Sequence, residues 1–174
     1  MATATGNDVT QSLFITGLQN IHGVENQALA LMDRQLDHLE NYPEVSDMLR
    51  KHRAETEEQI KRVDAILAEF DADPSKLKDI FLSISGNMAA LAHLPAPDEI
   101  LKNSFANYAF ENFEIASYTS LLTLADAAGV GNLAAPLELS LGEEQRMAAW
   151  VLESLPALTT KYVARRQAGE TASH

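Results

Sequence analysis

The segment FENFEIASY, residues 110–118, contains the spacing that decides the fold. Its apolar side chains recur at intervals of three and four, and Glu111 and Glu114 lie on neighbouring stripes of that pattern. This period is typical of an amphipathic α-helix, and strand-like alternation is hard to find elsewhere in the chain. We therefore place the segment in a long helix over 98–128, which ends at Gly129.

The same period extends outward in both directions and is interrupted by proline and glycine. Three further long helices are predicted at Asp8–Asn41, at Glu44–Phe70 and from Ser140 to about Arg165. The pair Asp73-Pro74 has the character of an N-cap followed by proline at the first helical position, so a shorter helix is expected from Pro74 to about Ala92.

Two signals describe the last helix in more detail. Ser140 and Glu143 have the spacing of a capping box, which predicts that the helix begins there. Pro156 removes a backbone donor and crowds the preceding turn, so it should bend the helix.

Four long helices predict an all-α four-helix bundle, with the short helix in the crossover between the second and third long helices. We expect this crossover to join parallel neighbours. Residues 1–174 form a single domain in this interpretation, and 1–7 and 167–174 are expected to be flexible tails.

The composition excludes several classes of function. The 174 residues include 25 acidic and 13 basic side chains, which gives a formal net charge of −12. Nucleic-acid binding generally needs a basic surface, so no such partner is expected. There is no cysteine. We find no secretory signal and no apolar run of about 18 residues that would span a membrane, so a cytoplasmic protein without a membrane partner is predicted.

Every long helix carries at least one glutamate on its apolar stripe. Burying an unpaired carboxylate is costly, so such acids must be protonated, paired with cations or bound to metal. No Lys or Arg occupies these stripes near the acids, and a pair of metal ions would neutralise them. The donor types favour two iron ions, with manganese or zinc as alternatives. The candidate metal ligands are Glu25, His52, Glu55, Glu111, Glu114 and Glu144.

Each of these residues also has an ordinary interpretation. A single glutamate on a helix stripe usually keeps its carboxylate in water while its stem packs. The combination on four helices favours an interior site instead. His22 lies three residues before Glu25 and is a weaker candidate ligand, whereas Glu143 is better explained as a cap. Tyr108 and Tyr118 are interpreted as core aromatics.

Four segments resemble the YciE/YciF-type ferritin-like proteins, in order and over about residues 12–162. These segments are Gly23–Gln27, His52–Thr56 with Gln59, Phe110–Tyr118 and Leu141–Glu144. The resemblance implies an up-down-down-up bundle that is commonly dimeric, is distantly related to rubrerythrins and bacterioferritins, and has a stress-response association without an assigned reaction. It also places the family's inward acids on the five candidate glutamates.

The chain departs from the broader ferritin pattern at two positions. Active di-iron bundles carry Glu-x-x-His on the second and fourth helices, but Glu58 and Met147 stand at the histidine positions. His52 precedes Glu55 instead, which argues against ferroxidase activity more than against metal binding. Two functions stay open: a di-metal protein with a redox or stress-response role, and a non-catalytic dimeric structural or interaction protein with a buried acidic network. No catalytic residue is assigned, and whether the protein is an enzyme stays open.

Overall fold

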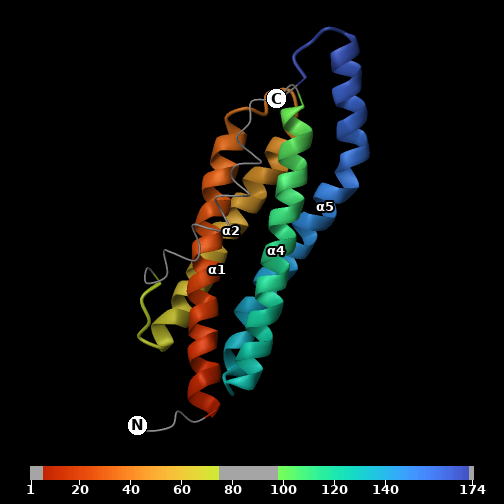
Figure 1. Cartoon of the computed structure of the whole chain (residues 1–174). Coiled ribbons are helices and arrows are strands. Elements are labelled where there is room, and N and C mark those ends of the chain that lie inside the picture. The colour runs from red at the N-terminus through yellow and green to blue at the C-terminus, as the bar shows by residue number, and fades with distance from the viewer. Residues whose placement is uncertain (1–5, 75–97, 173–174) are drawn as a thin grey trace.

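Four long helices lie side by side in the computed structural model, which describes residues 6–74 and 98–172 (Figure 1). They are α1 (Gly6–Leu36), α2 (Pro43–Glu69), α4 (Glu99–Ala127) and α5 (Ala134–Gln167), with a 3-10 turn, η2 (Gly131–Leu133), before α5. The predicted all-α bundle is confirmed. The short helix expected between Pro74 and Ala92 lies, apart from Pro74, outside the described residues.

The helices run up, down, down and up. Figure 1 shows that α4 begins at the end of the bundle where α2 begins, so these two helices run in the same direction. Helix α1 packs against α2 and α4, and α5 packs against α4 and α2. The chain between α2 and α4 therefore joins parallel helices, as predicted. These helices occupy opposite corners of the bundle, however, and are not the neighbours that we expected.

Helix α5 begins at Ala134, earlier than the predicted start at Ser140. Pro136 lies in its first turn, where a missing N–H costs nothing because that group has no partner within the helix. The predicted capping box is wrong, because both of its residues lie inside the helix. The Ser140 hydroxyl donates to the carbonyl of Pro136 at 3.2 Å, and Glu143 pairs with Arg62.

Two other features of the helices follow the sequence. Gly129, directly after the last residues of α4, has a φ of 71°, and the N–H of Val130 donates to the carbonyl of Ala125 at 2.9 Å. This is the left-handed glycine termination that the sequence predicted. Pro156 lies inside α5, and the C-terminal part of that helix runs in a different direction from the rest (Figure 1).

The buried residues form two apolar zones with a polar zone between them. Residues such as Phe14, Leu18, Val63, Leu67, Leu121 and Leu137 fill one end, and Met32, Leu49, Ile100, Val151 and Leu158 lie toward the other. Gly17 allows α1 to approach α4 closely, because a Cβ there would lie 2.8 Å from Cδ2 of Leu121. The polar zone lies in the central part of the bundle and holds the candidate site.

The C-terminal segment after α5 returns to the turn between α1 and α2. The buried Tyr42 hydroxyl donates to the carbonyl of Ala172 at 2.7 Å. Arg165, in the last turn of α5, donates to the carbonyl of Thr171 at 2.7 Å and to Asn41 at 2.8 Å. These bonds fasten the segment to the bundle, and the mobility of 1–7 and 167–174 stays a prediction. Among the described residues, no helix is long and apolar enough to cross a membrane.

Candidate metal centre

The six candidate ligands come from all four helices. Glu25 lies on α1, His52 and Glu55 on α2, Glu111 and Glu114 on α4, and Glu144 on α5. All but Glu55 are at most 5% exposed. The acids of α1, α4 and α5 turn inward as predicted, whereas Glu55, the candidate acid of α2, is only partly buried. Their role as ligands stays a prediction.

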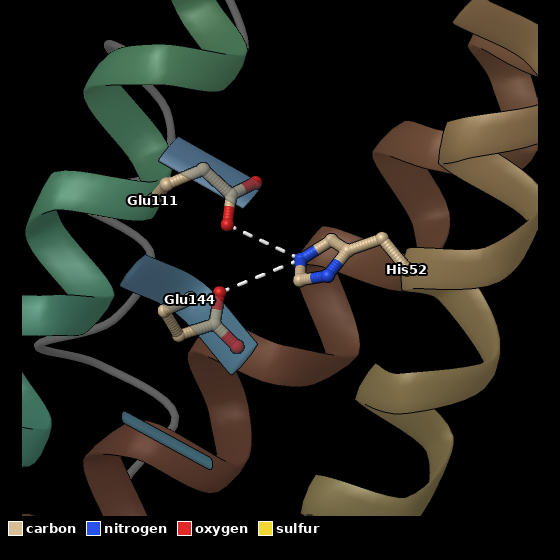
Figure 2. Close-up of side chains that lie close together, drawn as sticks. All are labelled: His52, Glu111 and Glu144. Atoms are coloured by element: carbon tan, nitrogen blue, oxygen red, sulfur yellow. Dashed lines mark ion pairs between the residues drawn. The ribbon is translucent and has the colours of Figure 1, made fainter. Parts of the chain in front are cut away.

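His52, Glu111 and Glu144 converge on one point. Nε2 of His52 lies 3.2 Å from Oε2 of Glu111 and 3.4 Å from Oε2 of Glu144. Figure 2 shows both carboxylates directed at this same imidazole nitrogen. None of these three atoms has a hydrogen-bond partner, so they are close without being aligned for hydrogen bonding. Potential ligand atoms of the three residues all lie within 4.8 Å of one another, so the group can hold a metal ion.

Glu25 and Glu114 extend the cluster on its driest side. Oε1 of Glu25 accepts a hydrogen bond from the Tyr118 hydroxyl at 2.5 Å, but its Oε2 has no partner. Neither oxygen of Glu114 receives an N–H or O–H bond. A proton on Glu114 would let it donate a hydrogen bond to the neighbouring carboxylate of Glu144. Unpaired buried carboxylate oxygens are costly, so this side requires either protons or a cation.

Burial shifts the pKa values of the residues in the cluster. It raises the pKa of Glu25 and of Glu114 well above the usual value, and the nearby carboxylate of Glu144 adds to both shifts. It also raises the pKa of Glu111 to about 8, against the opposing effect of His52. Burial alone would lower the pKa of His52, but the carboxylates led by Glu111 outweigh it and hold that pKa well above its usual value. The site therefore holds protons at neutral pH where a metal would otherwise supply positive charge.

Glu144 and Glu55 behave differently from the other acids. Burial would raise the pKa of Glu144, but the adjacent imidazole of His52, together with the amide of Gln59, holds that pKa below the usual value. The Glu55 side chain is 22% exposed, and its Oε2 lies 3.3 Å from Nδ1 of His52. This hydrogen bond lowers the pKa of Glu55. Glu55 thus forms the outer edge of the cluster.

A partly buried arginine that the sequence analysis missed completes the polar zone. Arg62 donates to both carboxylate oxygens of Glu143, at 2.6 and 3.0 Å. Gln59 donates to Glu143 at 3.0 Å and also to Glu144. The expectation that no Lys or Arg lies near the inward acids is therefore wrong. Arg62 follows Gln59 by three residues, and that spacing could have indicated its position because a long side chain reaches inward from the edge of a stripe.

Three other positions lie outside the cluster. Nε2 of His22 lies 3.2 Å from Asp64 at the surface, so the structure does not bring it to the candidate ligands. Glu58, at the first departure from the ferritin pattern, is exposed and pairs with Lys61. Met147, at the second, is buried among apolar side chains.

The donor set fits a metal ion. Among the described residues, the buried side-chain atoms without a partner are the Nε2 of His52, the amide oxygen of Gln59, and carboxylate oxygens of Glu25, Glu111, Glu114 and Glu144. Hard oxygen donors with one nitrogen suit iron, manganese or zinc.

Solved structures of other proteins have a similar fold, and a family model matches most of this chain. A protein of Xanthomonas campestris is similar at 27% identity and a TM-score of 0.76, over 91% of this chain and 99% of that one. The Escherichia coli stress protein YciF matches at 22% identity and a TM-score of 0.73, over 84% and 94% of the two chains. YcfI of Rhodopseudomonas palustris, proposed to be a structural protein, matches at 23% identity and a TM-score of 0.71, over 82% and 92%.

These neighbours and the up-down-down-up topology define a ferritin-like bundle. The family model described as a domain of unknown function, DUF892, matches residues 9–164. The chain belongs to this family, and the predicted resemblance to the YciE/YciF-type ferritin-like proteins is confirmed.

Proposed function

We propose that this protein binds a pair of metal ions, most favourably iron, in the polar zone of the bundle. The observation that carries the proposal is the set of buried donor atoms without partners, three of which converge within 4.8 Å. One ion would lie among His52, Glu111 and Glu144. A second would be held by Glu25, Glu114 and Glu144, with Glu55 completing the ligand set.

The chain's own residues prepare this site. Tyr118 orients Glu25 through its hydrogen bond, and Gln59 orients Glu144. The apolar zones on either side exclude water, which strengthens the attraction between the carboxylates and a cation. A bound metal pair would supply redox chemistry, such as reduction of oxygen or peroxide, in a stress response. A cytoplasmic homodimer without nucleic-acid or membrane partners is part of the same proposal.

Metal analysis of protein purified without chelator tests the proposal. We expect about two equivalents of metal after anaerobic loading with ferrous iron. Less than about a tenth of an equivalent of any transition metal would overturn the proposal, because a preformed buried site should not remain without metal under those conditions.

A second candidate is a structural or interaction module that keeps the ferritin scaffold. Two observations favour it: YcfI is proposed to be a structural protein, and the buried acids can satisfy one another by holding protons. In this case metal binding would be incidental, and the dimer would be the functional form.

Replacing Glu114 by glutamine separates the two candidates. A metal site should lose at least one equivalent of metal, because the amide removes an anionic ligand. The exposed Glu58→Gln variant on α2 is the control and should bind metal normally. If Glu114→Gln raises the melting temperature and metal content stays negligible in every variant, the structural module is supported instead. The measurements are metal content by elemental analysis and thermal unfolding with and without chelator.

A further inference from the structure

Glu55 is the point at which the buried cluster meets solvent. Its side chain is 22% exposed, whereas those of His52 and Glu144 are 1% and 0% exposed. One carboxylate oxygen, Oε2, faces the imidazole of His52 at 3.3 Å. The other, Oε1, faces outward. Among the candidate ligands, all of which lie in the described part of the chain, Glu55 alone links the interior to the surface.

Two cations flank the outward oxygen of Glu55. Nζ of Lys51 lies at 3.6 Å and Nη2 of Arg146 at 3.9 Å, from α2 and α5 respectively. Both side chains are well exposed, at 63% and 59%. These distances are ion-pair distances that exceed hydrogen-bond length, so the carboxylate is held loosely on this side.

The acids nearby do not neutralise this pair of cations. Glu143, one turn before Arg146, is taken up by Arg62, and Glu58, one turn after Glu55, pairs with Lys61 at 2.7 Å. Within residues 6–74 and 98–172, Glu55 is the single ion-pair partner of Lys51 and of Arg146. If Glu55 turns inward to bind a metal, two positive charges remain at the edge of the site. These two positive charges stand out on a protein whose formal net charge is −12.

We propose that the edge formed by Lys51, Glu55 and Arg146 is the route by which a small anion reaches the bound metal, and that this anion is the external ligand or substrate. The inference rests on the proposed metal site. Exposed charges of one sign concentrate ligands of the opposite sign and speed their association, while they slow like-charged ligands. This edge therefore favours small inorganic anions over free metal cations as the species that reacts at the bound metal.

The test uses the full chain loaded with Co²⁺, whose absorption reports its ligands, and azide as the probe anion. Rates of azide binding and of Co²⁺ uptake are measured by stopped-flow in the unaltered protein and in the double variant Lys51→Gln and Arg146→Gln. Lys61→Gln is the matched control, because Lys61 is an exposed lysine on the same helix that pairs with Glu58.

We expect azide association with the double variant to be at least about 3-fold slower at low salt, and Co²⁺ uptake to be faster. Both differences should fade at about 0.5 M salt, where exposed charges are screened. Opposite effects on an anion and a cation cannot come from a loosened fold, which would speed both. Rates that match those of the control, or that change in the same direction, would overturn the inference while leaving the metal site intact. Absence of Co²⁺ uptake by the unaltered protein would overturn both.

Discussion

At the scale of single residues, Arg62 supports the polar zone. It is not a candidate ligand. It is a largely buried cation that binds both oxygens of the buried Glu143. Its charge offsets that of Glu143, so this inward acid has a cationic partner within the chain itself. This explains why Glu143 belongs to the supporting network and not to the set of orphaned donors.

Replacing Arg62 by methionine should destabilise the metal-free protein by about 2–4 kcal/mol, because it leaves Glu143 buried without its partner. Urea unfolding in the presence of chelator measures this cost. The control is Arg53→Met, which removes ion pairs with the exposed Asp33 and Glu57 and should cost less than about 1 kcal/mol. Equal costs for the two variants would show that the pair of Arg62 and Glu143 is no stronger than a surface pair.

At the scale of elements, the end of α4 sets the direction of the chain into α5. Gly129 adopts a left-handed conformation there, and apart from its two chain neighbours no atom of the described residues lies within 4 Å of the position that a Cβ would occupy. The need for glycine is therefore one of backbone conformation and not of space.

The variant Gly129→Ala should consequently lose about 1 kcal/mol of stability through backbone strain. Gly131→Ala is a matched control, since Gly131 also has open space around it but has no positive φ. Thermal or urea unfolding of both variants checks the prediction. It would be contradicted if Gly131→Ala cost as much as Gly129→Ala.

At the scale of the whole molecule, the buried cluster should make the metal-free protein less stable as the pH rises. Glu111 keeps its proton up to a pKa of about 8 in the folded chain, whereas an unfolded glutamate loses it near 4.5. His52 also has a raised pKa when folded. In both cases the folded state binds more protons than the unfolded state, so stability falls between about pH 5 and 8. Glu55 and Glu144, with lowered pKa values, act only below this window.

We therefore expect the melting temperature of chelated protein to fall by about 3 °C or more between pH 5.5 and 8. Glu111→Gln should flatten this dependence, because the amide does not titrate. Bound metal should reverse the slope, since protons compete with it for the same atoms. Calorimetry across this range, with and without metal, checks the prediction, and a rising melting temperature in the chelated protein would contradict it.

Much of the fold could be predicted because the buried side chains of a helix recur every three or four residues. Eight residues from Phe14 to Leu39 follow this spacing of three and four, and all are buried although Leu39 lies just beyond α1: Phe14, Leu18, Ile21, Glu25, Ala28, Met32, Gln35 and Leu39. The third helix was predicted less well. Tyr108 and Ile115 are only half-buried, and the most buried face includes Asn103 and Phe110 instead. A helix with apolar residues on many sides has no single stripe, so its neighbours decide which side is covered.

The sequence by itself determined the four helices, their glycine and proline boundaries and the presence of acids inside them, because each depends on spacing within one helix. Tertiary structure alone decided which acids meet. It brought His52 to Glu111 and Glu144, paired Arg62 with Glu143, and left Glu55 at the surface edge. These outcomes depend on the relative rotation and height of different helices, and no spacing within one helix contains that information.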